Sequence, residues 1–246
     1  MITLTYHDLQ FALLRCPRAL VSVMKRPEWA GKVFVGGGFL RSIVSRDEIN
    51  DVDVFVSRKE DAERLAQDII RMPPEDWGRP ALMKMAGVIV TDNAITLTAK
   101  EPHIQIIYRW LFKQGKDVAD SFDFTCCCAA FWYDGENWES YCDPRFYCDV
   151  AAKRLIYRSP IRNEDAGGSA LRLLKYYRKG YCAPIDSYAA IIARLMAGVE
   201  NLHAWDRIDG KIDEPRLAKV LCGLLREVDP AIDPKHIAHL PAEETL

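Results

Sequence analysis

The sequence predicts an α+β protein, with strands and helices interleaved over residues 1–145 and helices alone over residues 146–246. Short β-branched runs recur through the first part, and runs with apolar residues at helical spacing lie between them. From about residue 145 the strand-like runs fade and only the helical spacing continues. The length of 246 residues fits two modest domains. We therefore expect a head domain followed by a smaller, all-helical domain with an acidic C-terminal tail.

The expected elements of the head alternate between the two kinds of spacing. Helices are predicted over residues 6–25, 38–45 and 58–72. Strands are predicted over residues 32–37, 50–57, 87–91, 94–99 and 103–110, and residues 123–141 are expected to form a hairpin that turns at Asp134 and Gly135. In the second domain, helical spacing covers residues 169–181, 186–202 and 214–228.

The charge of the chain is nearly balanced overall but uneven along its length. The formal net charge is −2, so no general positive field indicates adhesion to polyanions. The segment from Arg145 to Tyr181 contains nine Lys and Arg residues and three acids, whereas Glu200 to Leu246 contains ten acids and six bases. A basic middle and an acidic end favour a local anionic ligand.

The cysteines and the apolar runs indicate a reduced, cytoplasmic protein. The eight cysteines lack the spacing of a disulfide framework or a zinc knuckle, and Cys126, Cys127 and Cys128 are consecutive. We interpret that run as small apolar residues in a buried strand. The first residues do not resemble a signal peptide, and no apolar run approaches the ~20 residues of a membrane span.

Three glycines followed by two aspartates form the candidate functional site. On a strand, residues two apart point to the same face, so Asp51 and Asp53 project together. Two such carboxylates repel each other unless a cation lies between them, and Mg²⁺ takes oxygen ligands from one or two carboxylates and from substrate phosphates. The turn at Gly36, Gly37 and Gly38 exposes N–H groups that suit a triphosphate. Together these features are typical of a two-metal phosphoryl-transfer site.

Each feature also has a simpler interpretation. A glycine run can be an ordinary turn, and an Asp-x-Asp strand can be a solvated face. Arg172, Lys175 and Arg178, three residues apart, form a basic row on one helix stripe, which can itself be a solvated face. The aromatic pair at 176–177 can pack in a core, although Tyr177 lies close to the basic row and could stack on a base.

The order of these motifs resembles the polymerase-β-type nucleotidyltransferases, and specifically the head and neck of tRNA CCA-adding enzymes and bacterial poly(A) polymerases. The resemblance covers about residues 33–182. A Gly-Gly-x-x-Arg stretch precedes an Asp-x-Asp strand in that family, and later come a strand ending in arginine, an Asp-Phe-Thr segment and a basic neck helix. The matching positions here are Gly37, Gly38 and Arg41, then Asp51 and Asp53, then 105–109, then Asp123, Phe124 and Thr125, and finally Arg172, Lys175 and Arg178.

This resemblance implies a nucleotidyltransferase-type mixed β-sheet and a metal-dependent transfer of a nucleoside monophosphate from an NTP to a hydroxyl, possible acceptors being RNA or a tRNA 3′ end. It implies that Asp51 and Asp53 are catalytic and hold Mg²⁺ or Mn²⁺. The backbone of 36–38 and Arg41 would bind the triphosphate, Asp123 would belong to the segment that orients the sugar, and Arg172, Lys175 and Arg178 would face the base or the acceptor.

The sequence departs from the family pattern at positions that matter for chemistry. Gln105 stands where the family has a third acid, and an amide supplies neither negative charge nor a proton acceptor of that kind. Ser121 and Phe122 replace two arginines, and Cys127 replaces an asparagine. Two hypotheses follow: an active nucleotidyltransferase of altered specificity, or a catalytically degenerate nucleotide- or RNA-binding module derived from one.

Overall fold

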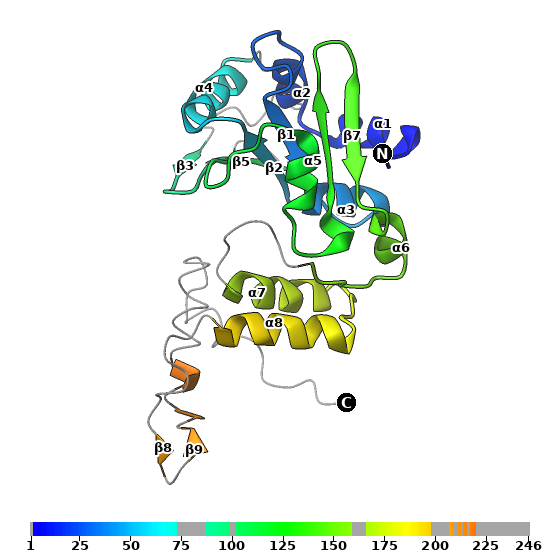
Figure 1. Ribbon diagram of the computed structural model, residues 1–246. Helices are drawn as coiled ribbons and strands as arrows, with labels where there is room; N and C mark the ends of the chain where they lie inside the picture. Colours follow the sequence, from blue (N-terminus) through cyan, green and yellow to red (C-terminus); the bar gives the residue numbers. More distant parts are fainter. Residues whose placement is uncertain are drawn as a thin grey trace. The chain divides into compact units, whose positions relative to one another are not determined.

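A computed structural model describes residues 2–72, 87–98, 102–158 and 166–197, and short pieces between 207 and 219 (Figure 1). The chain divides into two compact units, Met1–Arg162 and Asn163–Leu246. The sequence placed the boundary earlier, at 145/146. It lies later in the structure because helix α6 (Phe146–Ala151) packs against α3 (Gly38–Ser45) and the 3₁₀ helix η3 (Thr125–Cys127), which belong to the first unit.

The first unit is built on a seven-stranded mixed sheet with the order β3-β4-β5-β2-β1-β6-β7. In Figure 1 this order begins near the label β3 and ends at β7 on the other side of the sheet. Strands β2 and β5 are parallel and every other neighbouring pair is antiparallel. The strands are β1 (Val33–Gly36), β2 (Asp51–Val56), β3 (Val88–Val90), β4 (Ala94–Leu97), β5 (His103–Ile107), β6 (Ala129–Tyr133) and β7 (Trp138–Cys142).

One face of the sheet carries the longer helices of the unit. The side chains of Val52 and Val54 are fully buried on this face. Helix α4 (Lys59–Ile70) packs against β2, β4 and β5 through a buried stripe at helical spacing, which includes Ala62, Leu65 and Ile69. Helix α3 packs against β2 and β6. This face therefore forms the main apolar core of the unit.

The opposite face is covered in part by the short helix α5 (Gly115–Asp120). Phe34, Phe55 and Ala130 form a buried cluster there with Val118 and Ala119 of α5. Phe55 lies two residues after Asp53 on β2, so the aspartates belong to this same face. The structure thus places both carboxylates on the face that α5 covers around Phe55.

The prediction of one helix over residues 6–25 is wrong, because these residues form two helices. Helix α1 (Tyr6–Arg15) and helix α2 (Arg18–Met24) are separated at Cys16 and Pro17. Cys16 is extended, with φ −68° and ψ 141°, as expected of a residue that precedes proline. The proline also lacks the N–H needed to continue α1.

The cysteine run is buried as expected, but it is not a strand. Cys126 and Cys127 belong to η3, and Cys128 precedes β6. All three are buried free thiols. The hairpin that follows, β6–β7, turns at Asp134 and Gly135 as predicted. Helices α5 and α6 were not predicted, because six residues are too short to show a helical period.

The second unit contains two helices, α7 (Ala166–Tyr177) and α8 (Ile185–Ala197), which pack against each other. The rings of Tyr176 and Tyr181 lie 5.8 Å apart between centroids. A two-stranded ribbon, β8 (Arg207–Ile208) with β9 (Lys211–Ile212), accompanies the helices. Most of the third predicted helix, 214–228, and the acidic tail lie outside the described residues. Within the described part of the chain, no helix is both long and apolar enough to span a membrane.

Candidate nucleotide and metal site

Strand β2 positions the two aspartates as the alternation of its residues predicts. Asp51 and Asp53 are half-buried, whereas Val52 and Val54 between and after them are fully buried. The two carboxylates therefore share one face of the sheet, and neither projects freely into bulk solvent. This is the arrangement that a shared cation requires.

The register of the sheet sets a row of residues beside Asp53. Gly36 of β1 is its partner on one side and Gln105 of β5 is its partner on the other. Directly paired residues on neighbouring strands have side chains on the same face, and such strands lie about 4.7–4.9 Å apart. Gln105 thus lies next to Asp53 on the neighbouring strand. His103 is the corresponding partner of Asp51.

The chemistry of these side chains suits a hard divalent cation. Two carboxylates give the oxygen ligands that Mg²⁺ and Mn²⁺ prefer, and Mg²⁺ commonly binds through one or two carboxylates with phosphate oxygens. Among the described residues, no three His, Cys, Asp or Glu side chains are grouped so that they could hold a metal. The carboxylates that would hold a cation at this site are those of Asp51 and Asp53.

The glycine turn joins β1 to α3 and is shaped by two constraints. Gly37 has φ 76° and ψ −136°, a conformation that residues with a Cβ rarely adopt. The ring of Phe122 also packs on the turn, so that a Cβ added at Gly37 would lie 2.7 Å from two of its ring carbons. A Cβ at Gly36 would lie 3.2 Å from the same ring and 2.9 Å from the carbonyl oxygen of Ala129. The glycines are needed for this close packing.

One amide of the turn is unavailable for a phosphate, contrary to expectation. The N–H of Gly37 donates to the carbonyl oxygen of Ala129 at 3.1 Å. The first bond within α3 is made by the N–H of Arg41 to the carbonyl of Gly37 at 3.3 Å. The amides of residues 38–40 come before that bond and so have no partner within the helix. They are the amides of the turn that remain for an anion.

The side chain of Arg41 makes contacts within the first unit. Its side chain is almost completely buried, its Nη1 donates to the Oδ2 of Asp47 at 2.8 Å, and its Nη2 donates to the Oγ of Ser42 at 2.9 Å. These contacts tie α3 to the residues that follow it. Asp47 lies just after Arg46, whose φ of 58° turns the chain at the end of the helix. The role of Arg41 in triphosphate binding stays a prediction.

Asp123 lies in a segment whose polar groups point inward. Its side chain is buried, and its carbonyl oxygen accepts a bond from the N–H of Arg158 at 2.8 Å. The Oγ of Ser121 donates to the carbonyl of Val118, and the Oγ1 of Thr125 donates to the Oδ2 of Asp149, each at 2.6 Å. Asp123 therefore lies in the interior of the unit, and its link to a bound sugar stays a prediction.

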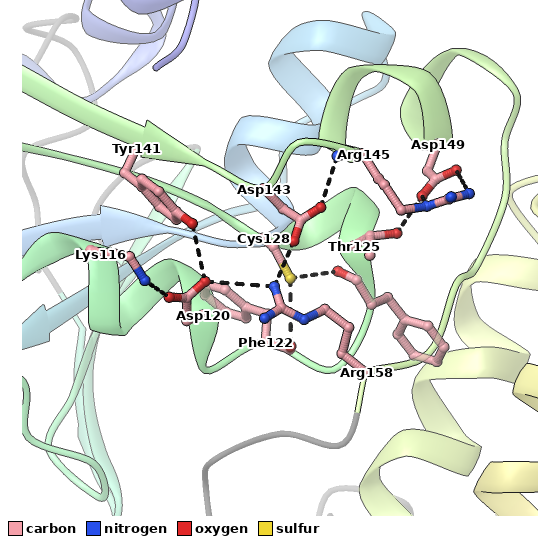
Figure 2. Close-up of polar contacts among 11 residues, drawn as sticks. Lys116, Asp120, Phe122, Thr125, Cys128, Tyr141, Asp143, Arg145, Asp149 and Arg158 are labelled. Carbon is pink, nitrogen blue, oxygen red and sulfur yellow. Dashed lines mark hydrogen bonds and ion pairs between the residues drawn. The ribbon is translucent and has the colours of Figure 1, made fainter. Parts of the chain in front are cut away.

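A network of charges that the sequence did not indicate surrounds this segment. Figure 2 shows the guanidinium of Arg158 between Asp120 and Asp143, with Nη1 3.5 Å and 2.6 Å from their carboxylate oxygens. Lys116 donates to Asp120, and this bond raises the pKa of Lys116. Burial raises the pKa of the nearby Cys128 thiol. Lys116 and Asp120 are four residues apart on α5, but Asp143 and Arg158 come from later parts of the chain, so no local spacing reveals the whole network.

A second group of charges anchors η3 to α6. The carboxylate of Asp149 is completely buried, and it accepts the bond from Thr125 and bonds from Arg145 at 3.0 Å and 3.2 Å (Figure 2). Arg154 lies 3.1 Å from the same carboxylate. A buried charge needs such pairing to be tolerated. The group therefore fixes the end of the segment that contains Phe122 and Asp123.

The predicted basic row lies in the second unit. Arg172 and Lys175 belong to α7, and the N–H of Arg178 donates to the carbonyl of Leu174 at 3.2 Å, which extends the helix by one residue. Lys175 and Arg178 are exposed, and so is Tyr177, with 67% of its surface accessible. The row is present on one helix as predicted, and its proximity to the aspartates stays a prediction.

Solved structures similar to this chain include CCA-adding enzymes. A CCA-adding enzyme in complex with ATP has a TM-score of 0.52 and 16% identity, over 77% of this chain and 46% of that chain. The Thermotoga maritima CCA-adding enzyme complexed with tRNA has a TM-score of 0.50 and 16% identity, over 77% of this chain and 45% of the enzyme. At such identities the likeness shows the fold alone. The chain thus has a polymerase-β-type nucleotidyltransferase-like fold.

The chain belongs to the Gabija anti-defense 2 (Gad2) family, whose model matches residues 15–153. A relative called Gabija anti-defense 2, from Bacillus phage SPbetaL7, is 26% identical over 180 residues. The match covers 72% of this chain and 40% of the phage protein, so the matched region spans two fifths of that relative's length.

Proposed function

We propose that this Gad2 family member is a metal-dependent nucleotidyltransferase that transfers a nucleoside monophosphate from an NTP to a hydroxyl acceptor, with RNA or a tRNA 3′ end as the acceptor class. The supporting observation is the position of Asp51 and Asp53 on one face of β2, beside the glycine turn. We further propose that this transfer serves the anti-defense role stated in the family's name.

Different residues of the chain would have different roles in this reaction. Asp51 and Asp53 would hold Mg²⁺ or Mn²⁺, which when bound neutralises phosphate charge and orients the reacting oxygens. The amides that open α3 would receive the triphosphate. The acceptor oxygen bonds to the α-phosphorus, pyrophosphate leaves with the electron pair of the broken bond, and the hydroxyl proton passes to water, since Gln105 cannot accept it.

A transfer assay tests this proposal. The protein is incubated with each α-labelled NTP, Mg²⁺ or Mn²⁺ and total tRNA, and label in the acid-insoluble product is counted. Asp51→Asn and Asp53→Asn preserve size and remove the charge, so each should lower the rate by at least roughly 10²–10³-fold. Glu63→Gln is the matched control. It replaces an exposed carboxylate of α4 by a carboxamide and should leave the rate unchanged. Equal rates in all four proteins would disprove the assignment.

A second function is favoured by the residues around Asp53. Gln105 replaces a charge at the adjacent register position, and the described residues offer no three-residue metal group. A nucleotide- or RNA-binding module without turnover would retain Asp51 and Asp53 for binding alone. Binding of an NTP that depends on Asp51, together with the absence of transfer to any RNA in the same preparation, identifies this alternative.

A further inference from the structure

The segment after α5, residues 121–131, has one side chain that reaches the surface, and that side chain is aromatic. Over residues 121–131 every residue is buried except Phe122, which is partly exposed. The hydroxyls of Ser121 and Thr125 are bonded inside the unit, to Val118 and Asp149. The side chain of Asp123 is also buried. A molecule that approaches this segment therefore meets a phenyl ring and no hydrogen-bonding side chain.

The ring of Phe122 lies next to the aspartate pair. It packs directly on Gly36 and Gly37, and it meets the ring of Phe55 edge to face at 5.8 Å between centroids. Gly36 is the register partner of Asp53, and Phe55 follows Asp53 by two residues on the same face. Two separate contacts thus place the ring against the register partner of Asp53 on β1 and against the next same-face residue on β2.

We propose that Phe122 is the residue on which the nucleoside of a bound nucleotide packs, and that the site accepts ribonucleotides and deoxyribonucleotides alike. This inference rests on the proposed function, because it assumes that phosphates are held at Asp51 and Asp53. The sugar is bonded directly to the α-phosphate, so a phosphate held at Asp51 and Asp53 brings the sugar near the ring, which packs on the glycine that pairs with Asp53. Carbon atoms of a phenyl ring neither donate to a 2′-hydroxyl nor accept from it in the manner of a polar side chain.

The magnitude of selection distinguishes the two kinds of site. A site built to hydrogen-bond a substrate hydroxyl rejects the analogue without it by roughly 10⁴–10⁵-fold, whereas an apolar surface separates molecules that differ by one hydroxyl by only about 10²-fold. With a phenyl ring under the sugar, we expect NTP and dNTP affinities within about tenfold of each other, well below either figure.

Equilibrium dialysis of the full chain with each NTP and its matching dNTP, in Mg²⁺, tests this inference without reference to turnover. Phe122→Leu keeps an apolar side chain of similar volume but removes the flat ring. It should weaken both members of a pair by about tenfold, as loss of stacking predicts, and leave their ratio unchanged. Phe112→Leu is the matched control: Phe112 also contacts the ring of Phe55, at 5.7 Å between centroids, whereas the ring that packs on Gly36 and Gly37 is that of Phe122. It should bind as the unchanged protein does.

Several outcomes overturn the inference. A preference of more than about 10² for the ribonucleotide would show that another group reads the sugar. Tighter binding by Phe122→Ala would show that the ring fills the nucleotide's place. Absence of binding by every nucleotide contradicts this inference and the proposed function together. Equal binding of NTP and dNTP without transfer contradicts only the enzymatic proposal.

Discussion

At the scale of single residues, the chemistry of the site depends on what stands beside Asp53. The row across the sheet reads Gly36, Asp53, Gln105 and Thr96, on strands β1, β2, β5 and β4. Only one of these four side chains carries charge. Gln105 can accept or donate a hydrogen bond but adds no charge beside Asp53.

Restoring a carboxylate at this position should raise the transfer rate. Gln105→Glu has nearly the same shape and adds a negative charge next to Asp53, so we expect an increase of roughly 10²–10³-fold, the usual worth of one preorganised electrostatic group. The rate is measured with the α-labelled NTP that the unchanged protein uses best. Thr96→Glu adds the same charge one strand farther away and should have little effect. Equal effects of both variants would contradict the assignment of Gln105 to the site.

The same scale shows what a sequence can reveal of a site. Asp51 and Asp53 could be assigned to one face because the period of a strand is two, and the structure confirms it. The burial of Arg41 could not be foreseen, because its partner Asp47 is brought near only by the left-handed turn at Arg46. The packing of Phe122 on Gly37 depends on a contact between distant segments, which no local pattern encodes.

At the scale of elements, the segment that carries Phe122 is held at both ends. Helix α5 precedes it, and Arg158 binds Asp120 at the end of that helix. Element η3 follows it and is tied through Thr125 to Asp149 of α6. A ring that must receive a ligand is useful only if its backbone is fixed, and these two charge groups fix it.

Removing the second anchor should destabilise the head. Asp149→Ala leaves the buried hydroxyl of Thr125 without its acceptor, and we expect a loss of about 1–3 kcal/mol in the free energy of unfolding. Urea unfolding followed by circular dichroism measures it. Glu139→Ala, at an exposed position on β7, is the control and should change stability by less than about 0.5 kcal/mol. An unchanged midpoint in Asp149→Ala would show that the buried group contributes nothing to η3.

The elements that were not predicted from the sequence were missed for physical reasons. The strands and helices α3 and α4 were predicted because each is long enough or regular enough to show a period. Helices α5 and α6 have six residues each, and the cysteine run forms a 3₁₀ turn whose apolar side chains look the same as those of a buried strand. Pro17 marks the break between α1 and α2 in the sequence. The prediction nevertheless joined the two helices, because apolar residues at helical spacing lie on both sides of the proline.

At the scale of the whole molecule, the division at 162/163 separates the candidate metal site from the basic row. Asp51, Asp53 and Phe122 belong to the first unit, and Arg172, Lys175 and Arg178 belong to the second. The order of motifs along the chain predicted the fold of the head. It could not fix the domain boundary, because α6 reads equally well as the start of a helical domain until its packing on η3 is known.

The buried titratable groups predict how the stability of the molecule changes in alkali. Burial raises the pKa of Cys142 to about 11 from 9.0, and that of Tyr147 to about 12 from 10.0. Each raised pKa means that the native state keeps a proton which the unfolded chain releases. Their contribution to stability is therefore complete below about pH 9 and is lost as the pH rises through the raised values.

The urea midpoint should accordingly fall between about pH 9 and pH 11, and the fall should be smaller in Cys142→Ala, which has no thiol to ionise there. Unfolding is followed at several pH values from neutral upward in reducing buffer. A midpoint in the unchanged protein that stays constant to pH 11, or the same decline in Cys142→Ala, would contradict the assignment of this effect to the buried thiol.

The most direct measurement is the binding of Mn²⁺ by the aspartate pair, followed through the electron paramagnetic resonance signal of the free ion as protein and NTP are added. If Asp51 and Asp53 hold a cation together with substrate phosphates, the unchanged chain will remove Mn²⁺ from solution in the presence of NTP, and Asp51→Asn and Asp53→Asn will each abolish that uptake. Uptake of Mn²⁺ by both variants equal to that of the unchanged chain would contradict a metal site on this strand.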